Sequence, residues 1–295
     1  MLNLEQLAGL LEKNRAAASA GVKEFFIGGR KFNFNSQPAV MGVINLSADS
    51  WYRESVCLSV EAAIRRGKVL CAQGADIVDV GAESTLAHAA RVDDAAQNDK
   101  LIPVIKKLRA DKILVSVETY SPGVARACLE AGANILNLTG NEASSKIFKM
   151  AAAHDAAVII CFVQGKNVRE VGEFNLSADP ISMMRDYFSR QIEIAQRNNL
   201  EKIFLDPGLG FYYRNLQDST VRVRHQMNVF LNTFRLRELG FPICHALPHA
   251  FEFFRDEVRC AEPFFAVLAA LGKTDLFRTH EVPRIKAVLD TMKAF

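Results

Sequence analysis

The sequence predicts a TIM-type (β/α)8 barrel, with a helix and a β-hairpin ahead of it. Eight short apolar segments alternate with eight longer segments of helical periodicity along the 295 residues. The short segments are nearly continuous apolar runs, which is typical of parallel strands covered by helices. Eight strand–helix units in a chain of this length favour a barrel first and a doubly wound sheet second.

The predicted elements alternate regularly along the chain. The strands are expected at residues 39–46, 76–80, 113–117, 135–138, 157–162, 203–205, 242–245 and 276–278. The helices are expected at residues 59–73, 97–110, 122–131, 144–154, 180–197, 218–239, 263–271 and 283–292. This order is that of consecutive βα units.

The first 38 residues are predicted to form an extension of a single barrel domain that spans residues 39–295. Leu4, Leu7, Leu10 and Leu11 have the spacing of an amphipathic helix. Farther on, Gly28-Gly29 separates two short apolar segments and predicts a hairpin. In a barrel, this hairpin is expected to close the N-terminal end of the strands.

Three glycines stand just past a predicted helix and just before a strand. They are Gly74, Gly132 and Gly272, in the segments QGADIVDV, AGANILNL and LGKTDLFRT. Because glycine tolerates a positive φ, we expect each of them to form a left-handed cap at its helix end.

Composition excludes several classes of protein. The 36 basic and 33 acidic residues are interspersed, with a net charge of +3, so no nucleic-acid footprint is indicated. There is neither a signal-peptide pattern nor an apolar run of about 20 residues. The six cysteines are widely spaced, which argues against a disulfide framework and a structural metal site. We therefore expect a globular cytoplasmic protein that binds neither nucleic acid nor membranes.

Polar residues follow nearly every predicted strand. In a TIM barrel the active site lies at the C-terminal ends of the strands. The polar residues found at these ends are Asn45, Asp79, Glu83, Ser84, Thr85, Glu118, Asn137, Asp206, His245, His249, Arg278 and His280. Any one of them has a simpler explanation as a cap or turn residue. Capping alone does not explain seven strands with the same feature.

The chemistry of these residues predicts a site with two parts. Glu118, Asn137 and Asp206 offer carboxylate and amide groups that can pair with the edge of a flat nitrogen heterocycle. By contrast, Asn45, Thr85, Arg278 and His280 are neutral or cationic hydrogen-bonding residues, which suit a phosphate or pyrophosphate.

Other nucleotide and hydrolase signatures are absent from the sequence. Gly208 and Gly210 in DPGLGFYYRN are weak evidence for a dinucleotide site and are also compatible with a simple turn. No P-loop pattern and no G-x-S-x-G elbow occurs, so ATP hydrolysis and serine hydrolase chemistry are not indicated.

Five segments, in this order, resemble dihydropteroate synthase and the wider family of pterin-binding enzymes. They are MGVINLSADS, GADIVDVGAEST, VSVETYSPGVARACLEAGANILNLTG, FLDPGLGF and RTHEV, and they span most of the chain from Met41 onward. The family is a TIM barrel and also contains methyltetrahydrofolate methyltransferases. The resemblance implies a transferase of folate biosynthesis that condenses 6-hydroxymethyl-dihydropterin pyrophosphate with p-aminobenzoate.

The resemblance also implies roles for individual residues. Asn45, Arg278 and His280 match the catalytic anion-binding positions, and Asn45 matches the residue that helps to hold Mg²⁺ through pyrophosphate. The pterin set implied by the resemblance is Glu118, Asn137, Asp206 and Cys161, and the arylamine and pyrophosphate set is Thr85, Ser84, Trp51 and His249. Residues 47–55, SADSWYRES, are expected to form a mobile loop that closes over the substrate.

Two loops depart from the family pattern. Leu86 stands where an Arg is expected, and residues 248–251, Pro-His-Ala-Phe, stand where the synthase has Ser-Arg-Lys-Ser. The charged residues that can replace the missing cations are His249, His88, Arg91, Arg53 and Arg255. Solvated loop charge is the simpler reading for each of them.

Three functions therefore remain open at the level of sequence. The first is a synthase, the second a methyltransferase relative that handles a methylated pterin, and the third a non-catalytic pterin-binding homologue. The apolar segments PFFAVLAALG and IKAVLDTMKAF have two readings, as the interface of a homodimer or as ordinary covering helices.

Overall fold

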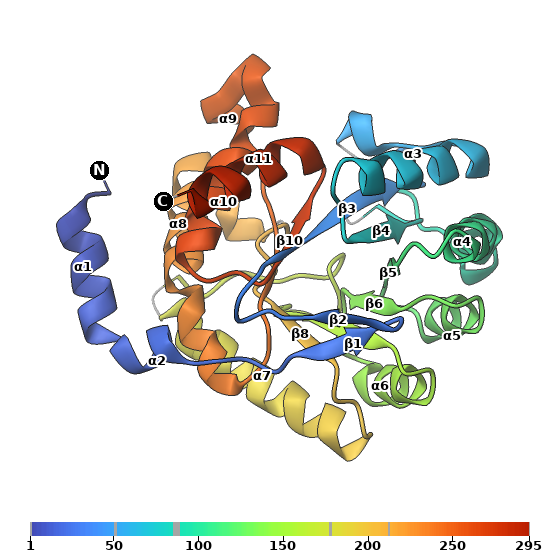
Figure 1. Cartoon of the computed structure of the whole chain (residues 1–295), viewed down its shortest axis with the longest axis horizontal. Helices are drawn as coiled ribbons and strands as arrows, with labels where there is room; N and C mark the ends of the chain where they lie inside the picture. Colours follow the sequence, from blue (N-terminus) through green and yellow to red (C-terminus); the bar gives the residue numbers. More distant parts are fainter. Residues whose placement is uncertain (1, 50–51, 85–88, 177–178, 212, 295) are drawn as a thin grey trace.

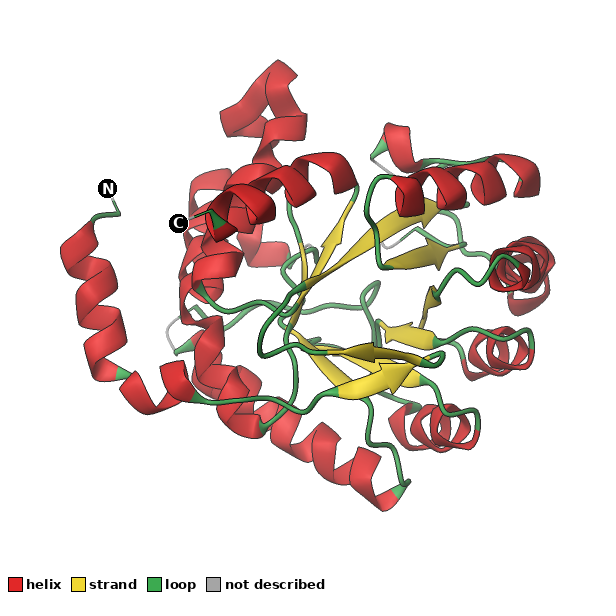
Figure 2. Cartoon of the chain, viewed as in Figure 1, coloured by secondary structure: helices red, strands yellow, loops and turns green. Residues whose placement is uncertain are grey.

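Eight parallel strands form a barrel surrounded by helices in a computed structural model of the chain, which describes residues 2–49, 52–84, 89–176, 179–211 and 213–294 (Figure 2). The barrel strands are β3 (Ala39–Asn45), β4 (Ile77–Gly81), β5 (Val115–Thr119), β6 (Ile135–Leu138), β7 (Ala157–Cys161), β8 (Ile203–Asp206), β9 (Cys244–Ala246) and β10 (Leu276–Thr279). Their order in the sheet is β8-β7-β6-β5-β4-β3-β10-β9. A parallel bridge between Leu205 and Ile243 joins the two edge strands, so the predicted barrel is confirmed.

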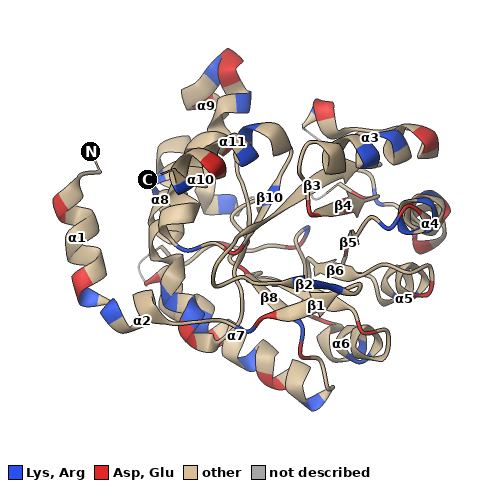
Figure 3. Cartoon of the chain, viewed as in Figure 1, with Lys and Arg blue, Asp and Glu red and all other residues tan. Residues whose placement is uncertain are grey.

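The helices cover the outside of the barrel (Figure 1). They are α3 (Val60–Ala72), α4 (Asp94–Ala110), α5 (Pro122–Glu130), α6 (Ser144–Ala153), α7 (Pro180–Arg197), α8 (Ser219–Asn232), α10 (Ala261–Leu271) and α11 (Val282–Lys293). Short segments η1 (Arg53–Ser55), η2 (Arg214–Leu216), α9 (Phe251–Phe254) and η4 (Arg255–Cys260) lie in the loops. Charged residues occur mainly along the outer helices and loops (Figure 3). No helix in the described ranges has both the length and the apolar character needed to cross a bilayer.

Side-chain caps and turn chemistry set several boundaries. The α4 helix begins earlier than predicted because the Asp93 side chain accepts a hydrogen bond from the Ala96 amide, capping the first turn. The single helix predicted for residues 218–239 is instead α8 followed by the 3-10 segment η3 (Thr233–Leu239). The Thr233 hydroxyl donates to the carbonyl of Val229 at the junction, which competes with regular helix geometry.

Two of the three predicted glycine caps are left-handed, and the third is not. Gly74 and Gly132 have φ values of 102° and 101°. Gly272 has φ −80°, and the left-handed residue at this junction is Lys273, with φ 59°. A Cβ on Gly272 would stand 1.8 Å from the carbonyl oxygen of Phe230. Close backbone packing, rather than a positive φ, therefore requires glycine at this position.

The N-terminal hairpin lies against the N-terminal ends of the barrel strands. It consists of β1 (Phe25–Ile27) and β2 (Arg30–Phe32), and it follows the helices α1 (Leu4–Lys13) and α2 (Arg15–Ser19). Phe25 and the nearby Phe34 pack edge-on against Phe204 of β8, with ring centroids 5.3 and 5.2 Å apart. This end is therefore closed by aromatic packing, as predicted.

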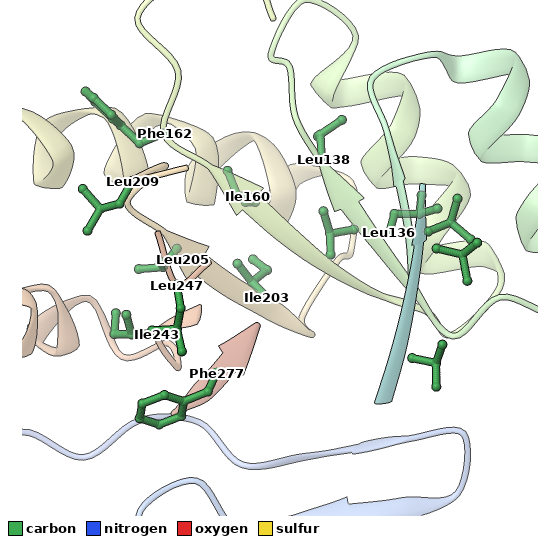
Figure 4. Close-up of a cluster of buried hydrophobic side chains, with 14 of the residues drawn as sticks. Leu136, Leu138, Ile160, Phe162, Ile203, Leu205, Leu209, Ile243, Leu247 and Phe277 are labelled. Atoms are coloured by element: carbon green, nitrogen blue, oxygen red, sulfur yellow. The ribbon is translucent and has the colours of Figure 1, made fainter. Parts of the chain in front are cut away.

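A layer of buried apolar side chains lies between the strands and the helices (Figure 4). Leu136 and Leu138, Ile160 and Phe162, and Ile203 and Leu205 alternate along three neighbouring strands and are almost fully buried. Alternation sends the residues between them into the barrel, which places Asn137 and Cys161 in its interior. The packing of apolar side chains thus fixes which polar groups face inward.

Candidate active site

The polar residues at the strand ends gather around one cavity. Its walls carry nine of the residues predicted for the site, which are Asn45, Ser84, Glu118, Asn137, Cys161, Asp206, His249, Arg278 and His280. The other two, Thr85 and Trp51, lie outside the described residues, as do Leu86 and His88. The remaining walls come from loop residues such as Leu209, Phe211 and Leu247.

Arg278 lies inside the barrel, at the centre of an acidic group. Its Nε donates to Asp79 Oδ2 at 2.7 Å, and its NH2 group donates to Glu118 Oε2 at 2.5 Å. The Asp79 side chain is fully buried, so this ion pair compensates a charge that water cannot reach.

These ion pairs connect the two predicted parts of the site. Arg278 is predicted to bind an anion, and in the barrel it pairs with carboxylates of the heterocycle-binding part. The cause is register: β10 lies beside β3, and β3 lies beside β4, so Arg278 and Asp79 both reach the barrel axis. The cation is shared by both parts of the cavity.

Asn137 has a fixed orientation in the same interior. Its amide nitrogen donates to Asp79 Oδ2 at 3.2 Å, and its amide oxygen accepts from the Cys161 thiol at 3.4 Å. The Cys161 carbonyl in turn accepts from the Tyr187 hydroxyl at 3.0 Å. An amide with both ends held in this way presents a fixed pattern of donor and acceptor to a ligand.

Asp206 ends β8 and begins a tight turn. Its Oδ1 accepts from the Gly208 amide at 2.7 Å. Gly208 has φ 72°, and a Cβ there would stand 2.4 Å from the carbonyl oxygen of Phe162. The glycine therefore lets the chain turn so closely that its own backbone orients the carboxylate.

Burial strongly perturbs the carboxyl groups of this cavity. Desolvation raises the pKa of Asp206 to about 6, against the opposing effect of the Gly208 amide and Arg278. Desolvation also raises the pKa of Glu118 to about 7, assisted by the charges of Asp79 and Asp206 and opposed by Arg278. One guanidinium faces three carboxylates, so the upward direction for Glu118 is the physically expected one.

The loop after β3 covers one side of the cavity. Asn45 donates from its amide nitrogen to Ser55 Oγ at 2.7 Å, which ties the strand end to the loop. Tyr52 is buried and stacks on the rings of His280 and His249, with centroids 4.5 and 5.1 Å apart. Its hydroxyl also donates to Glu281. The loop therefore has an aromatic anchor inside the site.

The remaining predicted residues have different positions. His245 points away from the cavity, with Nε2 2.9 Å from Thr233 Oγ1 and its ring against Phe230. Arg53, Arg91 and Arg255 are exposed and do not line the described part of the cavity. Among the described candidates for replacing the family's missing Lys and Arg, only His249 lies on the cavity wall.

An arginine and a glutamine on the cavity wall are not predicted by the sequence. Arg222 and Gln226 extend from α8 to the cavity wall, and Arg222 pairs with Glu252 at 3.0 Å. A signal was present, because residues 222, 226, 229 and 230 are the buried positions of α8 and two of them are polar.

Arg169 supports another part of the cavity from the loop after β7. It pairs with Glu83 at 3.2 Å, and both side chains are buried. It also donates to the carbonyl of Ser84 at 3.0 Å. Arg169 thus holds the loop after β4 in place through these contacts. No pattern in the surrounding sequence predicts this role.

Comparisons with known proteins agree with this geometry. The family described as pterin binding enzyme matches residues 41–246. A dihydropteroate synthase from Synechocystis sp. is 31% identical over 221 residues, which cover 74% of this chain and 73% of that protein. One from Clostridium beijerinckii is also 31% identical, over 74% of this chain and 76% of that protein.

Solved structures are similar over a larger part of the chain. A Xanthomonas albilineans dihydropteroate synthase with 4-aminobenzoic acid has a TM-score of 0.76 and 25% identity, covering 92% of this chain and 98% of that one. A Clostridium difficile dihydropteroate synthase, solved in the presence of pteroic acid, has a TM-score of 0.74 and 26% identity, covering 89% and 98%.

Proposed function

The chain belongs to the pterin binding enzyme family, and we propose that it is a dihydropteroate synthase. The reaction joins a 6-hydroxymethyl-dihydropterin to p-aminobenzoate with loss of pyrophosphate, as a step of folate biosynthesis. The observation that carries the proposal is that Asn137 and Asp206 line one cavity, together with Glu118 and Arg278. A structure with these side chains on opposite faces of the barrel would have ended the pterin interpretation.

The interior end of the cavity suits the pterin ring. A pterin presents two N–H donors on its pyrimidinone edge, and a carboxylate such as Asp206 accepts both. Asn137, held by Asp79 and Cys161, offers the donor and acceptor that recognise the neighbouring ring atoms. Glu118 stands beside Arg278 and completes the polar wall.

The outer end of the cavity suits the leaving group and the arylamine. His280 and Asn45 line this end, and Arg278 lies between it and the pterin end. In the proposed reaction the C–O bond to pyrophosphate breaks, and the amine of p-aminobenzoate attacks the pterin methylene carbon. Hydrogen bonds to the departing pyrophosphate stabilise its developing charge. Ser84 and His249 also line the cavity, and with Thr85 and Trp51 they are proposed to contact pyrophosphate or the arylamine.

Asn45 is proposed to help hold Mg²⁺ through pyrophosphate. Asn45 lines the cavity at the end of β3, and the hydrogen bond from its amide nitrogen to Ser55 fixes the orientation of its amide group. An amide oxygen fits a hard cation that retains water and phosphate oxygens as its other ligands. The cation would neutralise charge on the leaving group.

The altered loop after β9 changes the cavity without closing it. Ala250 is 1% exposed and packs in the apolar core, so this position contributes methyl packing where the synthase pattern has a Lys. The methyltransferase and non-catalytic alternatives are based on the absence of this Lys and of the Arg at position 86. No further observation favours either alternative, while the curated relatives are dihydropteroate synthases.

A homodimer and a cytoplasmic location are further parts of the proposal. Phe264, Val267 and Leu271 are exposed on α10 at helical spacing, which supports an interface on this helix. All six cysteines are free, which suits a reducing compartment. Light scattering of the purified chain tests the dimer, and a monomer at micromolar concentration would refute it.

The experiment that tests the function is titration with the pterin pyrophosphate followed by product analysis. Calorimetry with the pterin alone reports ring binding, and calorimetry with pyrophosphate reports the anion site. Formation of dihydropteroate on addition of p-aminobenzoate supports the synthase. Binding of the pterin without product would support a non-catalytic homologue, and no binding of either ligand would refute the pterin site.

A further inference from the structure

Two histidines and a glutamate meet at the cavity wall. His249 follows β9, His280 follows β10, and Glu262 is in the first turn of α10. One side-chain nitrogen or oxygen from each residue lies within 4.8 Å of the others. The three residues come from three separate elements, so the folded barrel is what brings them together.

Glu262 is the unusual member of this cluster. Its side chain is fully buried, and its ion-pair contact among the described residues is His249, with Oε1 3.4 Å from Nε2. A buried carboxylate without Lys or Arg is costly unless another cation compensates it.

The surrounding groups orient this carboxylate. The Thr279 hydroxyl and the amides of His280 and Glu281 donate to Glu262 Oε2, the amides at 3.1 and 3.3 Å. The His280 amide also lies 3.3 Å from Oε1, and the same Oε1 faces His249 Nε2. Outer hydrogen bonds of this kind are typical of carboxylates that bind metals, because they fix the direction of the ligand atom.

The spacing fits a transition metal better than an ordinary hydrogen bond. Ligand atoms about 2.0 to 2.1 Å from a tetrahedral Zn²⁺ are roughly 3.3 to 3.4 Å apart. The separation of 3.4 Å between His249 Nε2 and Glu262 Oε1 equals that value. One ligand atom of His280 lies within 4.8 Å of the other two, so metal binding draws it closer by at most about 1.4 Å.

The two imidazoles share one aromatic neighbour. Tyr52 stacks on both rings and shields them from water. Neutral imidazole is the form that coordinates a metal.

We propose that His249, Glu262 and His280 bind a divalent transition metal, with Zn²⁺ or Fe²⁺ as the chemical class. Two imidazole nitrogens and one carboxylate oxygen form the donor set that these ions share. Mg²⁺ prefers oxygen ligands, so this site is separate from the Mg²⁺ proposed at Asn45.

The position of the site gives it a role in the reaction. His249 and His280 line the cavity, so a metal between them stands where an anionic group enters. It supplies positive charge in the loop where residues 248–251 contain no Lys or Arg. This role rests on the proposed function, whereas metal binding itself does not.

Metal titration of the purified full chain, stripped with a chelator, tests the site directly. Co²⁺ is the first probe, because a protein-bound ion gives visible absorption bands, and Zn²⁺ competition follows. We expect one ion per chain at this site. His249→Ala lowers the Co²⁺ affinity at least about 100-fold, the upper end of what loss of a supporting ligand costs. His154→Ala is the matched control, because His154 is exposed just past the end of α6 and its replacement is expected to retain wild-type affinity.

The folded state of each variant is checked by circular dichroism. Zn²⁺ raises the melting temperature of the wild type and of His154→Ala, but not that of His249→Ala. Glu262→Gln keeps the size of the side chain and also loses Co²⁺ binding. If Glu262→Gln does not fold, the Co²⁺ affinity of His249→Ala alone tests the proposal.

Unchanged Co²⁺ affinity in a folded His249→Ala chain overturns the proposal, as does the absence of visible bands with wild type. The titration uses no pterin, so its outcome is distinct from that of the synthase assay. A chain that binds Co²⁺ and makes no dihydropteroate retains the metal site and loses the proposed function.

Discussion

Arg278 donates from Nε to Asp79 Oδ2 at 2.7 Å, across the interior of the barrel. Asp79 is fully buried and Arg278 nearly so, and 199 residues separate them in the chain. The pair joins the first half of the barrel to its last strand. It is therefore a structural element as well as part of the cavity.

Removal of Arg278 is predicted to destabilise the fold. Arg278→Met leaves Asp79 as an uncompensated buried charge, and the expected loss is about 3–5 kcal/mol of unfolding free energy. Urea denaturation measures it. Adding Asp79→Asn removes that charge and is expected to recover part of the loss.

The control for this prediction is a surface pair. Arg197 is 74% exposed and pairs with Glu193 within α7. Arg197→Met is expected to cost less than about 1 kcal/mol. Equal losses of unfolding free energy in Arg197→Met and Arg278→Met would show that the interior pair stabilises the fold no more than a surface pair.

Asp206 is predicted to be essential for pterin affinity. Asp206→Asn replaces an acceptor with a group that is partly a donor, and a hydrogen bond to a charged group contributes about 1.5–3 kcal/mol. The dissociation constant for a pterin is expected to rise roughly 10- to 150-fold in calorimetry. Asp290→Asn, an exposed change on α11, serves as the control. Wild-type affinity in Asp206→Asn would refute the assigned role.

Glu118 gives the stability a defined pH dependence. Burial raises its pKa from 4.5 to about 7 in the folded chain. Between these values the folded state holds a proton that the unfolded state has released, so this contribution is present at low pH and is lost as pH rises toward 7. The unfolding free energy of wild type, minus that of Glu118→Gln, is expected to fall by about 1–3 kcal/mol between pH 5 and pH 8.

Urea denaturation at both pH values measures that difference. A difference that grows with pH would mean that the Arg278 ion pair outweighs burial and that the pKa of Glu118 is lowered. The paired design removes the titration of every other group, which both chains share.

Gly272 is predicted to be irreplaceable for packing. Gly272→Ala forces a Cβ against the carbonyl oxygen of Phe230, and overpacking of backbone is expected to cost about 1–3 kcal/mol or more. Gly9 is in α1 with open space around it, so Gly9→Ala is expected to stabilise by roughly 0.4–1 kcal/mol. Thermal unfolding of both variants checks this contrast. A neutral Gly272→Ala would contradict the close approach.

The strands and the location of the cavity were predictable from local sequence. Apolar runs identify barrel strands because their side chains are buried on both faces, and the polar residues that follow them then share one end of the barrel. This reasoning found Asn137 and Asp206, and the structure places both in the cavity.

The pairing of side chains was not predictable in the same way. The contacts of Arg278 with Asp79 and of Arg169 with Glu83 depend on barrel geometry and on loop paths between distant segments. Glu262 was missed because it lies in a mostly apolar helix and its partners come from other loops. His245 is the middle residue of β9 and faces away from the cavity. Alternation along three residues is too short to reveal this from the sequence.

The measurement that tests the account most directly is product formation. The purified chain, with Mg²⁺, 6-hydroxymethyl-dihydropterin pyrophosphate and p-aminobenzoate, is predicted to release pyrophosphate and form dihydropteroate in equal amounts. Asp206→Asn is predicted to lose this activity, and Asp290→Asn to retain it. Binding of the pterin without any dihydropteroate, in a folded wild-type chain, would contradict the proposed synthase reaction.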